Sequence, residues 1–420
     1  VIDPACGSGS FLATTMGNVV EELRILYKGN EDKVHAAKRD WCTKQLFAID
    51  KDAVSVRLSK AYLSMLGDGS THVFKADSIR PKKFQAYEGW GAALAASIQD
   101  GTFDVVVTNP PFGTKLKVPP EVGRHEGYEL SQEWKKKDGK WIATGDYAER
   151  DLGLIFLERS IRLLRKGGRM AIVLPDTYLF SDSYGWLVQW LSQFTITHSI
   201  NVPIEAFEPH CRAKTSVLVL KKEKPKADHR IIGSYCETFG EDKHGRARFK
   251  FEDSGQQTNL RDDEMEEAAI LLKAGGGKTD SKLFFRFSQA EAIKRKVLVA
   301  SYWWRKPYED ALKKFATINN CELVAIGNLI ESGELEVMDG HGSPNSHFVG
   351  RGPIPYVKVI EIKNWRVNEN PKYGIPEDLA DKMRRGKFLQ PWDIVTPTRA
   401  SKNIGLFGVI MPWQTKLILT

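Results

Sequence analysis

Three short apolar runs near the start of the chain each end in an aspartate, and this pattern limits the folds that the chain can adopt. The runs are Val1-Ile2, Gln45–Ile49 and His72–Ala76, and the aspartates are Asp3, Asp50 and Asp77. A single acid at the end of a strand is most often a helix N-cap. Three in succession favour a common ligand, because ligands of parallel α/β sheets bind outside the carboxyl ends of the strands.

A glycine-rich turn follows the first run, with the sequence DPACGSGSFL from Asp3 to Leu12, and it opens a segment with helical spacing of apolar residues. Strand, glycine-rich turn and helix begin many nucleotide-binding units, and glycine lets the backbone approach a ligand closely. The dinucleotide fingerprint needs a third glycine where this chain has Leu12, which disfavours NAD and FAD. Asp50 lies 41 residues after Gly9, more than the usual spacing of about 20. We attribute the excess to an extra helix or loop between residues 29 and 40.

The three carboxylates suit three different groups: an ammonium, the hydroxyls of a ribose and the amino group of an adenine. This combination describes S-adenosylmethionine.

A fourth apolar run, Phe103–Thr108, leads into Asn109-Pro110-Pro111-Phe112. Two consecutive prolines fix φ and remove two backbone donors, so the loop cannot continue a strand ladder. The side-chain carbonyl of Asn109 and the carbonyl of Pro110 are able to accept both hydrogens of a planar amine. Stacking of its ring on Phe112 would contribute ~1–3 kcal/mol. The alternative interpretation is a tight turn with a phenylalanine in the core.

In this order, DPACGSGSFL, FAID, KAD and NPPF resemble the motifs of S-adenosylmethionine-dependent N6-adenine DNA methyltransferases. The flanking sequence is most similar to the modification (M) subunit of type I restriction-modification systems. The resemblance implies that Asp50 holds the ribose and Asp77 the adenine of the cofactor. It implies that the remaining cofactor-binding residues, on the methionine side, are Asp3, Ala5, Cys6, Gly7 and Gly9. It also implies that the catalytic residues are Asn109, Pro110, Pro111 and Phe112.

The adenine would be flipped out of double-stranded DNA at a cost of a few kcal/mol. The family also has a cofactor-binding segment and a helical domain before the first glycine motif. Because the chain starts at Val1 without a methionine and both ends read as strands, we expect a segment of a larger protein.

The pattern after the loop completes a sheet. Apolar spacing predicts a helix from Asp151 to Lys166 and strands at Arg169–Leu174, Thr195–Ile200 and Thr215–Leu220. Residues 1–222 are therefore expected to form an α/β, Rossmann-like methyltransferase domain with a seven-stranded, mostly parallel sheet. Tyr178 and Phe180 would lie on the target-base side, although core packing is the preferred interpretation of both.

The segment from Gly113 to Tyr147 is a polar insert directly after the NPPF loop. Its lysines are Lys115, Lys117, Lys135, Lys136, Lys137 and Lys140. A charge run of this kind usually forms a solvated face. Its position next to the loop leads us to the hypothesis that it contacts DNA phosphates.

Residues 223–316 are expected to be a connector of mixed pattern. The run Ala274–Thr279 is not a P-loop, because Leu272 occupies the leading glycine position and the run follows a helix. The aromatic and basic segment Tyr302–Pro307 could contact nucleic acid, but packing between domains is the preferred interpretation.

Residues 317–420 contain short β-branched runs broken by glycine and proline, which predict a mostly β, α+β domain. The succession resembles the start of a target recognition domain of type I specificity (S) subunits, and it implies a fusion of modification and specificity parts. Candidate DNA-facing cations are Lys363, Arg384, Arg385 and Arg399, which the sequence does not distinguish from ordinary surface residues.

The composition is consistent with these expectations. The 420 residues have a net charge of +8 and a pI of about 9.0, a balance that favours a nucleic-acid partner without requiring one. The five cysteines form no CxxC pair, which argues against a zinc site or a disulfide framework and for a reducing compartment. No apolar run is long enough to cross a membrane.

The sequence thus predicts a site-specific DNA methyltransferase acting on the N6 amino group of adenine in the cytoplasm of a bacterium or archaeon. Its expected partners are double-stranded DNA, a restriction endonuclease subunit, and a specificity subunit or further copies of itself. One alternative is an amino-methyltransferase for RNA or for protein glutamine, but those enzymes generally lack a second recognition domain. Another is a non-catalytic DNA-binding subunit, against which the intact Asp3, Gly7, Gly9 and Asn109 argue.

Overall fold

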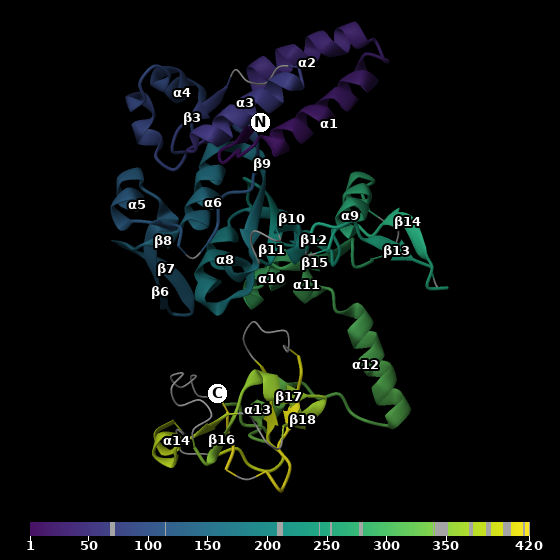
Figure 1. Cartoon of the computed structure of the whole chain (residues 1–420). Helices are drawn as coiled ribbons and strands as arrows, with labels where there is room; N and C mark the ends of the chain where they lie inside the picture. The colour runs from purple at the N-terminus through teal and green to yellow at the C-terminus, as the bar shows by residue number, and fades with distance from the viewer. Residues whose placement is uncertain are drawn as a thin grey trace. The chain divides into compact units, whose positions relative to one another are not determined.

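The computed structural model describes residues 1–67, 72–113, 115–207, 213–242, 244–252, 254–276, 280–338, 340, 352–368, 373–383, 388–397, 405–414 and 416–419. Contacts divide the chain into two units, Val1–Ala311 and Leu312–Thr420, which are described separately (Figure 1). Residues 208–212, the end of the rejected P-loop run (277–279), Arg384, Arg385 and Arg399 lie outside the described residues. The predicted boundaries at 222 and 316 stay predictions.

The first unit is built on a nine-stranded sheet in the order β15-β12-β10-β11-β9-β4-β1-β2-β3. The seven predicted strands are present: β1 (Ile2–Asp3), β2 (Phe47–Asp50), β3 (Val73–Lys75), β4 (Phe103–Thr108), β9 (Leu164–Pro175), β10 (Thr195–Val202) and β11 (Thr215–Lys221). Two strands from the predicted connector, β12 (Arg230–Tyr235) and β15 (Phe285–Ser288), extend it beyond β10. Only β11 and β15 run against the direction of the other strands, so the sheet is mostly parallel, as predicted.

Helices cover both faces of the sheet, as the side chains of β2 show. Ala48 packs into a cluster with residues of α1 (Ser10–Leu26), α2 (Glu31–Gln45) and α3 (Ala53–Met65). Its neighbour Ile49 points to the other face and joins the large core cluster that includes α4 (Gly91–Ser97) and α6 (Leu152–Leu163). Each fully buried apolar side chain contributes roughly 1.5–3 kcal/mol. From the sequence we expected either a helix or a loop in the polar stretch before β2. The structure has a helix there, α2.

The helix after the insert is shorter than predicted. We expected it to reach Lys166, but α6 ends at Leu163 because the chain from Leu164 onward pairs with β4. The register places Leu164 opposite Phe103 and, after an irregularity, Arg169 opposite Val105. The Nζ of Lys222 donates to the carbonyl of Leu164 at 2.7 Å, which supports this extended start of the strand.

The polar insert folds into a small structure of its own. It contains β5 (Lys117–Val118), α5 (Pro120–Glu126), β6 (Gln132–Lys137), β7 (Lys140–Tyr147) and β8 (Arg150–Asp151). The strands β6 and β7 form a hairpin, and β5 pairs with β8, so the insert closes on itself before α6 begins. The hairpin turn is Asp138-Gly139, with φ of +49° and +78°, as tight two-residue turns require.

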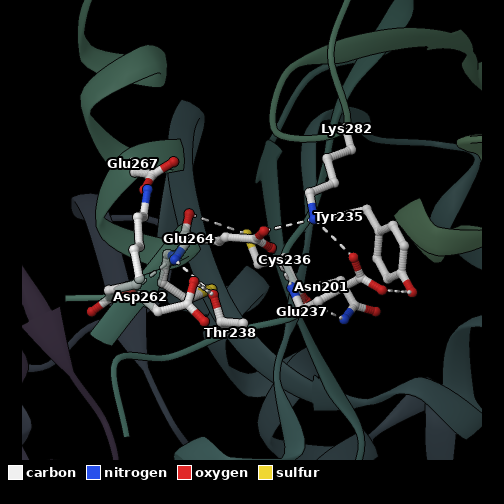
Figure 2. A network of polar contacts seen from close by, with 12 residues as sticks. Asn201, Tyr235, Cys236, Glu237, Thr238, Asp262, Glu264, Glu267 and Lys282 are labelled. Carbon is white, nitrogen blue, oxygen red and sulfur yellow. Dashed lines mark hydrogen bonds and ion pairs between the residues drawn. The ribbon is translucent and has the colours of Figure 1, made fainter. Parts of the chain in front are cut away.

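The predicted connector contains β13 (Phe249–Phe251), β14 (Gln257–Arg261), α9 (Glu264–Lys273), α10 (Gln289–Arg295) and α11 (Ala300–Trp303). Figure 2 shows the polar network that joins the end of β12 to α9. Lys282 lies 2.8 Å from Glu237 and 2.6 Å from Glu264. The network therefore attaches the connector to the large sheet.

The aromatic segment of the connector packs within the first unit. The ring of Trp303 stacks on Phe287 with centroids 5.1 Å apart, and Trp304 lies 5.2 Å from Phe285. These contacts explain the aromatic run by packing against β15. Packing between domains stays a prediction, because the domain boundaries stay predictions.

The second unit has short elements. The helix α12 (Lys306–Asn319) spans the division, followed by α13 (Ile326–Glu331) and α14 (Glu377–Met383). Three strands form one small sheet, β19 (Gly374–Ile375), β16 (Ile354–Val357) and β22 (Ile418–Leu419). Four form another, β17 (Ile362–Lys363), β18 (Trp365–Val367), β21 (Gly408–Val409) and β20 (Ile394–Val395). The resemblance of residues 317–420 to a specificity domain stays a prediction. Within the described part of the chain, no helix has the length and apolarity needed to span a membrane.

Candidate active site

A cavity of about 290 Å³ lies beside the carboxyl ends of the parallel strands. Among the predicted site residues it brings together Ala5, Asp50, Asp77 and Pro111. The other predicted residues do not line it: Asp3, Cys6, Gly7, Gly9, Asn109, Pro110 and Phe112. The turn after β1, the acid that ends β2 and the loop after β4 therefore meet at one place, as the strand-end pattern predicts.

The glycine turn has no room for a side chain at Gly9 but has room for one at Gly7. Gly9 has a φ of +86°, and a Cβ there would lie 2.7 Å from Oγ of Ser59 on α3. The same hydroxyl donates to the carbonyl of Gly7 at 3.1 Å. Gly7 has a φ of +53°, and a Cβ there would meet no atom within 4 Å. The turn thus packs tightly on α3 and leaves free space on the Cβ side of Gly7.

Asp50 is held by two main-chain groups. Its Oδ2 accepts from the N–H of Gly7 at 2.9 Å, and its Oδ1 accepts from the N–H of Asp52 at 2.8 Å. Each carboxylate oxygen keeps a further lone pair. The group is therefore fixed in orientation on the cavity wall and is still able to accept hydrogen bonds from hydroxyls.

Asp77 lies two residues beyond the end of β3, which stops at Lys75, and not at the strand end where the sequence placed it. Its N–H donates to the hydroxyl of Tyr87 at 2.8 Å. Its carboxylate lies 3.4 Å from Nε of Arg80 and 3.6 Å from Nζ of Lys51. The carboxylate is directed to the cavity wall by its cationic neighbours.

A buried arginine positions the segment that contains Asp77. Arg159 of α6 is fully buried, donates through Nε to the carbonyl of Ser78 at 2.8 Å and forms an ion pair with Asp100. The hydroxyl of Ser78 in turn donates to the carbonyl of Pro4. The segment after β3 is thereby tied to the turn after β1. The apolar spacing of residues 151–166 predicts a helix around Arg159 but does not indicate this role.

Asp3 and Cys6 lie beneath the turn. Asp3 is only 1% exposed, and its Oδ1 accepts from the N–H of Ala5 at 3.0 Å. Burial raises the pKa of Asp3 to about 7, the N–H of Ala5 opposes the shift, and the charge of nearby Asp50 adds to it. Burial likewise raises the pKa of the Cys6 thiol to about 12. The thiol therefore stays protonated at neutral pH.

The NPPF loop leaves the sheet directly after Thr108, which pairs with Ile172. Asn109 and Pro111 are exposed, whereas Pro110 is buried. Among the described residues, the Asn109 side chain makes no hydrogen bond, so its carbonyl is available to a ligand. The ring of Phe112 meets that of Phe207 edge to face, with centroids 5.6 Å apart and an angle of 77° between the planes. Phe207 ends a short helix after β10 (Ile204–Phe207).

The insert and α6 form a wall of the cavity that the sequence did not predict. The lining residues from these segments are Lys115, Leu116, Lys117, Val118, Pro119, Leu152 and Phe156. Lys117 forms an ion pair with Asp151, whose Oδ2 accepts from the Tyr184 hydroxyl at 2.6 Å. A run of lysines contains no signal for this packing. Lys51, by contrast, could have been identified from the sequence as a cavity residue, because it directly follows Asp50.

Tyr178 is buried against Tyr184, with ring centroids 4.9 Å apart, while Phe180 is 49% exposed. Core packing therefore accounts for Tyr178.

Residues 1–294 match the model of the N-6 DNA Methylase family. The chain is 25% identical to the methylase subunit of the type I restriction enzyme EcoEI of Escherichia coli over 54% of this chain and 38% of that protein. It is 25% identical to the type II methyltransferase M.VspI of Vibrio sp. over 55% of this chain and 44% of that protein. It thus spans less than half the length of these relatives. A solved structure, the type I restriction-modification methyltransferase subunit of Streptococcus thermophilus, aligns with a TM-score of 0.44 and 17% identity, over 71% of this chain and 53% of that one.

Proposed function

Because the chain belongs to the N-6 DNA Methylase family, we propose that it transfers the methyl group of S-adenosylmethionine to the N6 amino group of adenine in double-stranded DNA. The observation that supports this most directly is the meeting of the Asp50-bound glycine turn and the Pro111 loop at one cavity. Within the family, the proposed role is that of the modification component of a restriction-modification system. It would act in the cytoplasm of a bacterium or archaeon, with endonuclease and specificity subunits, or further copies of itself, as partners.

The residues around the cavity fit the cofactor. Asp50 has free lone pairs for the ribose hydroxyls, and Asp77 has a carboxylate for the adenine amine. The open space around Gly7 suits the methionine part, with Asp3 beneath it. The cavity volume of about 290 Å³ is near the lower end of small-molecule sites, which begin at roughly 300 Å³. When bound, the cofactor supplies an electrophilic methyl group on a sulfonium.

The role of Asn109 follows from the chemistry of adenine. The exocyclic amine is a poor nucleophile, because its lone pair is delocalised into the ring. The Oδ1 of Asn109 and the carbonyl of Pro110 accept its two hydrogens, which favours a tetrahedral nitrogen with a localised lone pair. No strong general base is required before the transfer. As the bond from nitrogen to the methyl carbon forms, the bond from that carbon to sulfur would break, and the nitrogen would then release a proton to solvent.

Phe112 would hold the flipped base from one side. Its edge-to-face contact with Phe207 fixes the plane of the ring, so that stacking of the base would contribute ~1–3 kcal/mol. The base itself reaches the loop only after it leaves the duplex.

The proposal is tested with the full-length protein, S-adenosylmethionine labelled in the methyl group, and equal amounts of duplex DNA, RNA and a protein mixture. We expect the label on the N6 atom of DNA adenine after digestion and mass spectrometry. Asn109→Ala should abolish transfer and leave cofactor affinity unchanged, whereas Asn18→Ala, on the exposed side of α1, should transfer normally. Label on RNA or protein alone, or full activity of Asn109→Ala, would refute the proposal.

A further inference from the structure

The β6–β7 hairpin presents a lysine-rich face that is exposed and packs on no other described element of the first unit. Its cross-strand pairs are Lys135 with Ile142 and Lys137 with Lys140, and directly opposed residues share one face of a hairpin. All four side chains are exposed, Ile142 by 51%. Lys136 is exposed as well and belongs to the opposite face, across from Trp141.

The opposite face anchors the hairpin. Trp134 stacks on Trp186 of α8 (Gly185–Leu191), with ring centroids 5.3 Å apart. Gln189 of the same helix accepts from the N–H of Trp141 at 2.9 Å and donates to its carbonyl at 2.8 Å. The hairpin lies beside α5 and α8 (Figure 1). It is thus a rigid element whose lysine face is left to solvent by its own packing.

The hairpin belongs to the same insert that forms the cavity wall. The insert begins directly after the NPPF loop. It ends with β8, next to Leu152, which lines the cavity. Its base is closed by the β5–β8 pair and by the ion pair of Lys117 with Asp151. The lysine face therefore has a fixed connection to the candidate active site.

The charges on this hairpin favour an anionic partner. Between residues 135 and 142 there are four lysines and a single acid, Asp138, in the turn. Within the described part of the chain, none of these lysines forms an ion pair. The remaining hairpin acids, Glu133 and Asp146, are on the strand segments nearer its base.

We propose that Lys135, Lys137 and Lys140 bind phosphates of the DNA that flanks the target adenine. This inference rests on the proposed function and adds the surface that holds the duplex. Phosphate contacts position DNA without reading its sequence. The hairpin is therefore a positioning element, and recognition of the site belongs to other parts of the protein.

The test compares two triple variants of the full-length protein. One is Lys135→Gln with Lys137→Gln and Lys140→Gln. The control is Lys166→Gln with Lys224→Gln and Lys226→Gln, three exposed lysines near the start of β9 and the end of β11, at the strand ends opposite to the cavity. Binding of a fluorescent duplex is measured by anisotropy over a range of salt concentrations. Because each phosphate contact contributes about 0.9 to the slope of log K against log salt, the hairpin variant should lose roughly 2 to 3 units of slope and the control none.

Methyl transfer gives a second readout. The KM for DNA should rise roughly tenfold or more in the hairpin variant, while kcat at saturating DNA stays unchanged. Asp138→Asn removes a negative charge from the hairpin and should therefore strengthen DNA binding. It keeps the turn, because asparagine also adopts positive φ. It should tighten binding roughly twofold at low salt.

Unchanged slopes in the triple variant and unchanged affinity in Asp138→Asn would overturn the inference. Absence of methyl transfer by the unaltered protein would instead overturn the proposed function, even with the slope effects intact.

Discussion

The main-chain N–H of Gly7 donates a hydrogen bond to Oδ2 of Asp50 at 2.9 Å. The two residues are 43 positions apart, one in the turn after β1 and the other at the end of β2. This bond sets the distance between the glycine turn and the carboxylate that we assign to the cofactor ribose. Asp50 is therefore a structural partner of the turn and, in our proposal, also a ligand of the cofactor.

Replacement of this carboxylate should weaken both cofactor binding and folding. Asp50→Ala leaves the N–H groups of Gly7 and Asp52 without their acceptor and removes the proposed ribose contact. We expect S-adenosylmethionine affinity to fall roughly tenfold to a hundredfold and stability to fall by about 2 kcal/mol. Isothermal titration and thermal unfolding measure the two effects.

The matched control for this variant is Asp52→Ala. Asp52 caps α3 by accepting from the N–H of Ser55 at 2.7 Å. Its loss should cost about 1 kcal/mol of stability and leave cofactor affinity unchanged. Equal loss of affinity in both variants would contradict the assignment of Asp50.

The conformation of the turn makes a prediction about two glycines. Gly9→Ala forces a left-handed alanine against Ser59 and should destabilise the protein by about 2 kcal/mol or more. Gly17→Ala lies within α1, where a Cβ meets no atom within 4 Å, and should stabilise it by about 0.5–1 kcal/mol. Chemical denaturation measures both. Equal effects of the two substitutions would show that the turn is not constrained as described.

Arg159 is predicted to act on cofactor binding from a distance. Arg159→Met removes the donor that holds Ser78 and should reduce stability by about 2–4 kcal/mol. Because Asp77 is adjacent to Ser78, cofactor affinity should fall as well. The exposed ion pair of Arg165 with Asp104 provides the comparison, since Arg165→Met should cost less than about 1 kcal/mol. Normal cofactor affinity in a folded Arg159→Met protein would exclude the positioning role.

The raised pKa of Asp3 predicts a specific dependence of the free energy of unfolding on pH. Its pKa is about 7 in the folded protein and 3.8 in the absence of burial, so the folded state binds more protons between these values. The free energy of unfolding should therefore decrease as the pH rises from about 4 to about 7, by on the order of 4 kcal/mol at most.

Asp3→Asn removes this contribution. The variant should gain stability relative to the unaltered protein as the pH rises from about 4 to about 7, as measured by urea unfolding at several pH values. Glu158 and Asp176 also have pKa values raised by burial, but they are present in both proteins and cancel in the comparison. A constant difference between the two proteins at every pH would contradict the prediction.

The sheet of the first unit was predictable because its residues obey simple patterns. Runs such as Phe103–Thr108 are apolar over most of a strand. Asp3 and Asp50 fall at strand ends, whereas Asp77 lies two residues beyond β3. The addition of β12 and β15 was not predictable, because these strands are stabilised at the sheet edge by tertiary contacts such as those of Trp303 and Trp304.

The site was only partly predictable for a similar reason. Asp50 and Pro111 are local features of strand ends, and both line the cavity. Arg159 and Phe156 reach the site from α6, where they follow the same helical spacing as core residues. The hairpin lysines read only as a charge run, because the tryptophans that anchor the hairpin meet α8 far away in sequence.

The central claim is methylation of adenine in DNA, and it is tested most directly by mapping modified bases. The full-length gene is expressed in a host without adenine methylation, beside Asn109→Ala, and the genomic DNA is sequenced with detection of N6-methyladenine. Our account predicts modified adenines within one recurring sequence in the first strain and none in the second. Unmodified adenines in both strains, with the protein folded and bound to S-adenosylmethionine, would contradict it.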